Sequence, residues 1–302
     1  MIKYKIKQVP EDFIVEEIFN FNNKTGPYGI FKLTKKNYST TSAVRIISRI
    51  LRIPLKNIGF AGMKDKVAVT TQLISIKNSK KEIRISNLST EFLGISDEPI
   101  TLGSHEGNHF EIIVRNITKK PELKEKFINY FGEQRFSKSN IEIGRAIIKK
   151  DWKKAVELID NEFILEHLKH NPTDYLGAIK TLPIKITRLF VASYQSYLWN
   201  ETVNLIEEKP ETLPIPGFGI ELHPITQELM NKEGITERDF IIKQFPQLTL
   251  EGVEREVFSK VKNLEISELQ TDELNKGMKK LNLKFDLDKG CYATEFIRQL
   301  FE

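Results

Sequence analysis

Hydrophobic and polar positions alternate through much of the first third of the chain, a pattern typical of half-buried β-strands. Two short strands are predicted within 3–18, separated by a turn at Pro10–Asp12. A third predicted strand, 27–36, runs into a basic turn. Further strands are predicted at 72–76 and at 110–114, where apolar residues occupy alternate positions.

A spacing of three to four residues between apolar positions predicts helices in the rest of the chain. The first, 42–52, follows threonine and serine residues that can cap it, and it ends before Pro54. Arg45, Arg49 and Arg52 form a stripe on this helix, which is either a solvated surface or a set of phosphate contacts. The remaining elements are predicted helices at 121–131, 140–160, 187–206 and 293–300 and a strand at 281–287.

Length and composition narrow the class of protein. A chain of 302 residues, 40% of them hydrophobic, is long enough for two domains or one large domain. No run approaches the roughly 18 apolar residues of a membrane span, and the N-terminus has no apolar signal core. The single cysteine, Cys291, excludes an intramolecular disulfide, and five scattered histidines argue against a zinc site. We therefore expect a cytoplasmic protein without a bound metal.

The net charge of +5 is unevenly distributed along the chain. Residues 1–154 contain 29 lysines and arginines against 16 acidic residues, whereas residues 155–302 contain 17 against 25. A basic half suggests a polyanionic partner such as nucleic acid. A well-solvated surface in a lysine-rich protein would give the same counts, so charge alone leaves both interpretations open.

The stretch 59–72 has the sequence GFAGMKDKVAVTTQ. Its one acid, Asp65, lies between Lys64 and Lys66, and nearby positive charge favours an ionised carboxylate. The small residues before it favour a turn, and the β-branched residues after it favour a strand. This pattern predicts a turn that presents one charged acid, although an incidental charge cluster in a surface loop would look similar.

A second unusual stretch, 129–137, has the sequence NYFGEQRFS. Aromatic residues alternate there with a glycine, polar residues and a single cation, Arg135. That composition suits a cleft that binds nucleic acid, because aromatic rings can stack on bases. A packed aromatic turn would have the same composition.

These two stretches resemble the signature motifs of the TruD family of tRNA pseudouridine synthases. The first is similar to AG-x-KD-[KR]-x-A-x-T-x-Q at 61–72, and the second to NYFG-x-QRF at 129–136, both without departure. Shorter resemblances are K-x-x-PEDF-x-V from Lys7, GN-x-F at 107–110 and G-x-YAT-x-x-x-R ending at Arg298. The likeness is loose across 155–190 and 205–280.

The resemblance implies an α+β fold with two domains. The expected catalytic domain, 1–145 with 247–302, has a mixed, mainly antiparallel sheet flanked by helices. The expected insertion domain, 146–246, is mostly helical or α+β and looks short for the family. An RNA cleft is expected between the two domains.

The resemblance also implies the roles of individual residues. Asp65 falls on the catalytic aspartate, and Lys7 on an active-site lysine that we expect to pair with it. Asn108 falls on an active-site asparagine, and Phe110 takes the place of an aromatic residue that contacts the target base. We also expect RNA contacts from Lys64, Lys66, Gln134, Arg135, Arg45 and Arg49.

The implied reaction is the isomerisation of a uridine in tRNA, with position 13 expected, to pseudouridine. The base must leave its stack to reach the enzyme. No cofactor is required, because the reaction neither changes oxidation state nor adds a group. A monomer is the family-based expectation. The alternatives are a non-catalytic RNA-binding protein on the same scaffold and an enzyme acting on a small phosphorylated substrate, for which no phosphate loop of the form G-x-x-x-x-G-K-[ST] is present.

Overall fold

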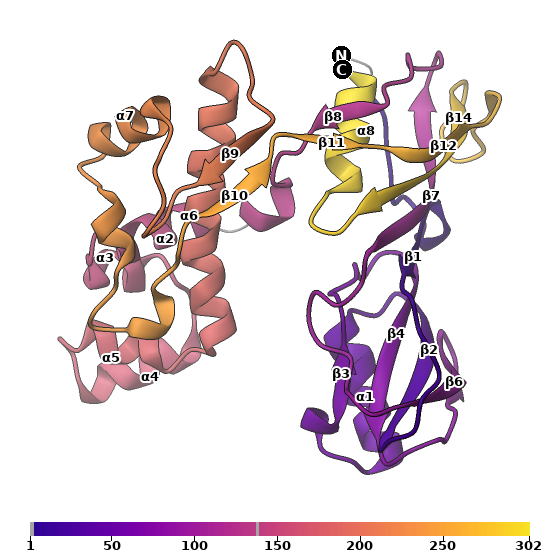
Figure 1. Cartoon of the computed structure of the whole chain (residues 1–302), viewed down its shortest axis with the longest axis horizontal. Coiled ribbons are helices and arrows are strands. Elements are labelled where there is room, and N and C mark those ends of the chain that lie inside the picture. The colour runs from indigo at the N-terminus through magenta and orange to yellow at the C-terminus, as the bar shows by residue number, and fades with distance from the viewer. Residues whose placement is uncertain (1–2, 137–138) are drawn as a thin grey trace. The chain divides into compact units, whose positions relative to one another are not determined.

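The computed structural model describes residues 3–136 and 139–302, except for the side chain of Gln134 (Figure 1). Within these ranges, no helix has both the length and the apolar character that crossing a membrane requires.

The described residues form two compact units. Unit 1 comprises Met1–Phe127 and Ser259–Glu302, and unit 2 comprises Ile128–Phe258. The chain passes between the units at β8 (Lys126–Ile128) and β11 (Phe258–Lys260), which pair with each other. The domain boundaries predicted from the sequence remain a proposal.

Unit 1 is built on one large sheet. Within the described residues, eight of its strands lie side by side in the order β12-β14-β7-β1-β4-β2-β6-β5. In addition, β13 pairs with β14, and β3 pairs with β4. Among its described strands, β1 and β4 form the one parallel pair, so the predicted mixed, mainly antiparallel sheet is confirmed. The elements of unit 1 are η1 (Pro10–Asp12), β1 (Phe13–Ile18), β2 (Tyr28–Lys36), α1 (Thr40–Leu51), η2 (Leu55–Asn57), β3 (Ile58–Phe60), β4 (Val69–Lys77), β5 (Arg84–Ile85), β6 (Leu88–Ser96), β7 (Gly107–Ile117), β12 (Lys262–Ile266), β13 (Gln270–Thr271), β14 (Lys279–Asp288) and α8 (Ala293–Phe301).

One face of this sheet can be followed from strand to strand by its register. Lys35 of β2 pairs with Thr70 of β4, which pairs with Val15 of β1. Val15 in turn pairs with Phe110 of β7, and directly paired side chains lie on the same face. Helices α1 and α8 both pack on this face, at different ends of the sheet (Figure 1).

Each of these helices completes a separate hydrophobic core. Ile47 of α1 packs with Phe31 of β2, and Phe296 of α8 packs with Phe285 of β14. All four side chains are fully buried, and burial of one such side chain contributes about 1.5–3 kcal/mol. The two cores leave a strip of the same face between them, and this strip carries polar side chains.

Much of the opposite face of the sheet is polar, although Ile30 of β2 and Leu73 of β4 are buried there with Ile100 in a small hydrophobic cluster. Cross-strand ion pairs line it, including Lys32 with Glu16 (2.6 Å) and Lys284 with Glu111 (3.1 Å). Antiparallel sheets commonly have one packed and one solvated face, which explains the alternation in the sequence.

Unit 2 is mainly helical and is organised around its longest described helix, α6 (Ile184–Leu205). Phe190, Tyr194 and Leu198 of that helix are buried in the core, as expected for an aromatic stripe at helical spacing. The elements of unit 2 are η3 (Glu133–Phe136), α2 (Asn140–Ile148), α3 (Trp152–Glu157), α4 (Glu162–His170), α5 (Tyr175–Lys180), α6 (Ile184–Leu205), β9 (Thr212–Ile215), α7 (Pro224–Lys232), η4 (Glu237–Phe240), η5 (Pro246–Leu248) and β10 (Val253–Glu256).

Two of the predicted helices differ in the structure. The prediction of a helix at 121–131 is wrong, because this segment forms backbone hydrogen bonds with a distant part of the chain. Glu125 O accepts from Val261 N, and Phe127 buries its ring beside Phe296 (5.4 Å between centroids). The helix predicted at 140–160 is broken at Lys150, whose left-handed backbone (φ 59°) separates α2 from α3.

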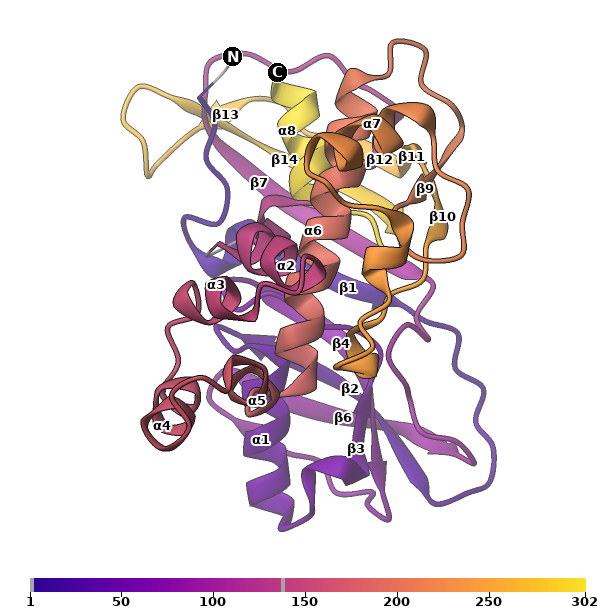
Figure 2. The same cartoon turned by 90° about the vertical axis from the view of Figure 1, so that its left-hand side faces the viewer.

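Helices α2 and α6 cross in close contact at Gly144 (Figure 2). A Cβ atom at this position would lie 2.1 Å from the carbonyl oxygen of Phe190, a backbone atom that cannot rotate away. We therefore expect Gly144→Ala to lower the free energy of unfolding of unit 2 by about 1–3 kcal/mol through overpacking. Urea unfolding followed by tryptophan fluorescence reports on this unit, because both tryptophans of the chain, Trp152 and Trp199, lie in it.

The matched control is Glu142→Ala, an exposed position on the same helix, for which a change within about 0.5 kcal/mol is expected. Equal stability of the Gly144→Ala and Glu142→Ala variants would contradict the close crossing.

Candidate active site

The segment 61–68 is the loop between β3 and β4, and side chains from other elements hold its backbone. The hydroxyl of Thr40, in the first turn of α1, accepts a hydrogen bond from the backbone N–H of Lys64 (2.9 Å). The same hydroxyl donates to Gln72 Oε1 of β4 (2.9 Å). Gln72 in turn donates through Nε2 to the carbonyl of Gly62 (3.1 Å). These contacts fix the loop against both the helix and the sheet.

Lys35 supports the same loop from within the protein. Its side chain is fully buried, and its Nζ donates to the carbonyl oxygens of Asp65 (3.0 Å) and Tyr38 (2.6 Å). Burial lowers the pKa of Lys35 to about 8, although the negative charge of Asp65 acts in the opposite direction. A buried ammonium group thus fixes the backbone at the residue predicted to be catalytic.

The carboxylate of Asp65 contacts Lys7, as the sequence motifs predict. Lys7 Nζ lies 2.5 Å from Asp65 Oδ2, a charge-assisted hydrogen bond. The same ammonium group lies 4.1 Å from the centroid of the Phe13 ring, within cation–π range. About a third of the Asp65 side chain (32%) is exposed, so a substrate can reach the carboxylate.

Lys64 and Asn108 meet at a buried ion pair. Lys64 Nζ lies 2.9 Å from Glu17 Oε1 and donates to Asn108 Oδ1 (2.5 Å). Glu17 is fully buried, and its second oxygen accepts a hydrogen bond from the backbone N–H of Leu73 (3.2 Å). Burial lowers the pKa of Lys64, while Glu17 opposes this shift. The contact fixes the amide of Asn108, with its carbonyl oxygen toward the lysine.

Phe110 lies in the core next to this group of polar residues. Its ring is 6% exposed, stacks on Phe285 (5.3 Å between centroids) and meets Phe13 edge-on (6.2 Å). Phe13 carries the ammonium group of Lys7 on its face, so Phe110 is one ring removed from the Lys7–Asp65 pair. The predicted contact of Phe110 with the target base remains a proposal.

The residues predicted to bind RNA fall into two groups. Lys66, Arg45 and Arg49 are exposed, the first in the Asp65 loop and the others on α1. The ammonium group of Lys64 is instead engaged inside the protein, with 7% of the side chain exposed. The side chain of Gln134 lies outside the described residues. The predicted RNA contacts remain proposals.

The stretch 129–136 forms a packed turn in unit 2. Phe131 is buried, and the amide of Asn200 on α6 both donates to its carbonyl and accepts from its N–H (both 3.0 Å). The guanidinium carbon of Arg255 lies 4.0 Å from the Phe131 ring centroid, and that of Arg135 lies 4.9 Å from it. Of the two interpretations left open by the sequence, these contacts favour the packed aromatic turn for Phe131.

Sequence reasoning missed Glu17, Lys35, Thr40 and Gln72. Glu17 and Lys35 could have been found from strand periodicity, because each occupies a position that alternation assigns to the buried face. A charged residue at such a position requires a partner, and is therefore a candidate for function. Thr40 gave no such signal, because the sequence cannot show which loop its hydroxyl meets.

Among residues 3–136 and 139–302, no group of three or more acidic, histidine or cysteine side chains is placed to hold a metal ion.

Comparison with known proteins connects this geometry to a family. The family model for tRNA pseudouridine synthase D (TruD) matches residues 2–163, 159–211 and 210–300. A probable tRNA pseudouridine synthase D 2 of Methanocaldococcus jannaschii is 32% identical over 388 residues, covering 98% of this chain and 91% of the relative. The tRNA pseudouridine synthase D of Aquifex aeolicus is 32% identical over 384 residues, covering 98% of both chains. Both alignments exceed 302 positions, so these relatives contain segments that this chain lacks.

A solved structure agrees with the sequence comparisons. The crystal structure of a putative tRNA pseudouridine synthase D from Methanosarcina mazei superposes with a TM-score of 0.73 at 28% identity, covering 98% of this chain and 93% of that one. The fold and these matches place the chain among the pseudouridine synthases. Within that class it belongs to the TruD family of tRNA pseudouridine synthases, which confirms the resemblance seen in its motifs.

The buried ammonium group of Lys35 predicts how stability depends on pH. The pKa of Lys35 is about 8 in the folded state, against 10.5 for an ordinary lysine, so the unfolded state binds more protons between these values. Stability must therefore rise with pH across this window. Relative to Lys35→Met, the wild type should gain about 2 kcal/mol of unfolding free energy between pH 7 and pH 10. Urea unfolding followed by circular dichroism at each pH measures this difference.

The control is Lys36→Met, because Lys36 lies on the other face of the same strand. Between pH 7 and pH 10, the unfolding free energy of Lys36→Met should change by the same amount as that of the wild type. If Lys35→Met also ran parallel to the wild type, the assignment of a shifted ammonium group at position 35 would be rejected.

Proposed function

We propose that this chain isomerises a specific uridine of tRNA to pseudouridine, with Asp65 as the catalytic residue. The observation that carries the proposal is the carboxylate of Asp65, which is held in the loop that bears the family signature. Lys7 binds one of its oxygens at 2.5 Å, and a third of the side chain stays exposed to a substrate. Family membership supports tRNA as the substrate class, because the matched relatives are named tRNA pseudouridine synthases.

The reaction breaks the bond between N1 of the uracil and C1′ of the ribose, rotates the base and forms a new bond from C5 to C1′. The hydrogen on C5 is lost as a proton, and N1 gains one. Asp65 can act as a nucleophile at C1′, as carboxylates do in glycosidases, or as a base that removes the C2′ proton. Both routes use the carboxylate of Asp65, and Lys7 holds its Oδ2 through a charge-assisted hydrogen bond.

The neighbouring residues supply the other requirements of the reaction. The target base must be extruded from its stack, at a cost of a few kcal/mol. Stacking on an aromatic ring would offset part of that cost, and Phe110, a buried ring separated from Lys7 by Phe13, is the contact we propose. The fixed amide of Asn108 can hydrogen-bond to the base or to the loop.

We propose position 13 of tRNA as the target and a monomer as the active form. Phosphate contacts from exposed cations would hold the RNA against unit 1. The proposed phosphate contacts are Lys66, Arg45 and Arg49. Lys64, whose ammonium group is engaged by Glu17, and the unit 2 residues Gln134 and Arg135 are the other residues that we propose to contact RNA.

Tritium release from tRNA transcribed with [5-³H]uridine tests the chemistry directly, because pseudouridine formation expels the C5 hydrogen. We expect release by the wild type and a loss of about 10³-fold or more for Asp65→Asn, since the variant keeps the shape but lacks the charge. Asp97→Asn is the matched control, an exposed aspartate paired with Lys24 elsewhere in unit 1. A transcript with cytidine at position 13 checks the site.

Binding of tRNA, measured in parallel, separates the possible outcomes. Binding without release by the wild type, on transcripts of several tRNAs, would favour the non-catalytic RNA-binding alternative. Equal release by the wild type and Asp65→Asn would remove Asp65 from its catalytic role. Release from the cytidine-13 transcript at the wild-type level would move the target to another position.

The arginine stripe of α1 generates a separate prediction about affinity. If Arg45 and Arg49 contact phosphates, each change to glutamine should weaken tRNA binding and reduce the slope of log K against log salt by about 1. Fluorescence anisotropy with labelled tRNA at several salt concentrations measures both. The control is Lys119→Gln, an exposed cation after β7, which should leave the slope unchanged. Unchanged slopes for both arginine variants would leave the stripe as a solvated helix face.

A further inference from the structure

Lys7 adopts a backbone conformation that lysine rarely has. Its φ is 57°, in the left-handed region, where a Cβ atom crowds the following carbonyl group. A residue keeps such a conformation only where the surrounding structure imposes it. The contacts on either side of Lys7 therefore determine where its side chain points.

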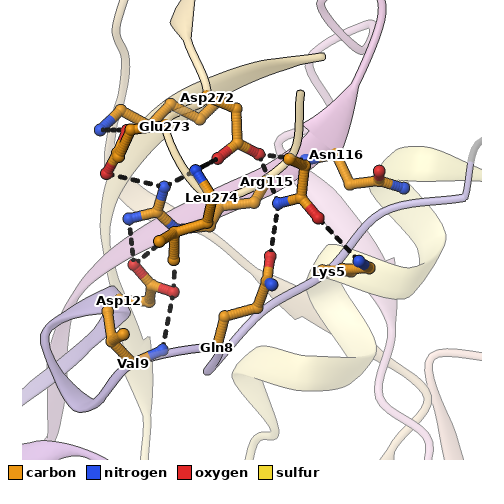
Figure 3. Close-up of polar contacts among 11 residues, drawn as sticks. Lys5, Gln8, Val9, Asp12, Arg115, Asn116, Asp272, Glu273 and Leu274 are labelled. Atoms are coloured by element: carbon orange, nitrogen blue, oxygen red, sulfur yellow. Dashed lines mark hydrogen bonds and ion pairs between the residues drawn. The ribbon is translucent and has the colours of Figure 1, made fainter. Parts of the chain in front are cut away.

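On the N-terminal side, Lys5 is attached to β7 and to a distant loop. Its backbone exchanges two hydrogen bonds with Arg115 (2.9 and 2.8 Å). Its side-chain Nζ donates to Oδ1 of Asn275 (2.7 Å), in the loop between β13 and β14 (Figure 3).

On the C-terminal side, the same asparagine binds Gln8. Asn275 Nδ2 donates to Gln8 Oε1 (2.7 Å), so the two ends of one amide group bridge the residues that flank Lys7. The next residue, Val9, donates its N–H to Asp12 Oδ2 (3.2 Å). The segment is thus held at positions before and after Lys7.

A buried charge cluster holds Asn275 in turn. Asn275 Nδ2 also donates to Asp272 Oδ2 (2.8 Å), and Asp272 Oδ1 accepts from Arg115 Nη1 (3.0 Å). Arg115 is buried and also donates to Asp12 (2.9 Å) and pairs with Glu273 (3.0 Å) (Figure 3). Burial alone would raise the pKa of Asp272, but hydrogen bonds, including those from Asn275 and Arg115, lower it to about 2.

We infer that Asn275 is a positioning residue for Lys7, and that the Arg115–Asp272 pair behind it keeps it in place. The amide group spans Lys5 and Gln8 and so imposes the backbone conformation that directs Lys7 Nζ to Asp65. The inference rests on the proposed function, because it assigns a catalytic consequence to the Lys7–Asp65 contact. The loop 272–275 acts through the N-terminal segment, which Asn275 binds at Lys5 and Gln8.

The chemistry of an amide explains why asparagine fits this position. Its oxygen accepts from the ammonium group of Lys5, and its nitrogen donates to both Gln8 and Asp272. An aspartate at 275 would keep the first contact, lose both donors and place a second carboxylate against Asp272. Asn275→Asp should therefore disturb Lys7 at least as much as Asn275→Ala.

A double-mutant cycle on tritium release from tRNA tests the inference. We expect Asn275→Ala to lower kcat by about 10- to 100-fold, the cost of misplacing a reactive group, with little change in tRNA affinity. In a Lys7→Ala background the same substitution should change kcat by less than about twofold, because there is no ammonium group left to position. A merely structural role would lower kcat by the same factor in both backgrounds, and that result would overturn the inference.

Two further variants distinguish loss of positioning from a general folding defect. Gln8→Ala removes the same bridge from an exposed residue and should lower kcat by about 3- to 10-fold in the wild type only. Thr90→Ala is the control, because it removes a buried hydrogen bond (2.8 Å to Ile83 N) on β6. It should leave kcat within about twofold. Wild-type kcat for both Gln8→Ala and folded Asn275→Ala would refute the positioning role.

A crystal structure of the Gln8→Ala or Asn275→Ala variant gives a readout that does not depend on activity. We expect Lys7 to leave the left-handed region and its Nζ to move out of hydrogen-bond range of Asp65. If the wild type makes no pseudouridine, the proposed function fails, yet displacement of Lys7 would still support the positioning role. Lys7 unmoved in both variants would overturn that role whatever the activity.

Discussion

The Lys7–Asp65 ion pair depends on one parallel pairing in an otherwise antiparallel sheet. β1 and β4 run in the same direction, with Ile14 beside Val69. The segments that precede them therefore meet the sheet at the same end of the two strands. Lys7 lies in the segment before β1, and Asp65 lies in the loop before β4. An antiparallel arrangement of these strands would place the two residues at opposite ends of the strands. The topology of unit 1 therefore brings together groups that are 58 positions apart.

Charged groups are buried on the face of the unit 1 sheet that α1 and α8 cover, at a cost to stability. Lys35 and Lys64 are removed from water, and the pKa of each is lowered as a result. Glu17 and the carbonyl of Asp65 compensate them only in part, and buried ion pairs are weak evidence for stability. Their placement is better explained by the need to hold one exposed carboxylate in a fixed orientation. Hydrophobic packing under α1 and α8, on either side of the strip, supplies the stability that these charges do not.

Local sequence patterns predicted strands β1, β2, β4, β7 and β14 and the helices at 42–52, 187–206 and 293–300, because alternation and helical spacing record which face is buried. These patterns also predicted a first strand before Pro10, where the described residues form only an isolated bridge from Lys5 to Arg115. They failed at 121–131, where pairing with a distant strand overrides helix propensity. Motif resemblance predicted the contact of Lys7 with Asp65, whose catalytic role is still to be tested. It could not predict the Arg115–Asp272 pair, whose members are 157 positions apart, and no local pattern marks Lys7 as left-handed.

The order of strands in unit 1 has a consequence for how the protein is made. β14 lies between β12 and β7, yet it is synthesised last of the three, after the whole of unit 2. Until then a nascent chain contains both Asp65 and Lys7, but β7 is an edge strand paired with β1 alone, and the loop bearing Asn275 does not exist. Unit 2 is complete on the ribosome before unit 1 can close, so the sheet of unit 1 passes through a stage with an aggregation-prone open edge. Loss of the last thirty residues or so would leave the chain in that state permanently.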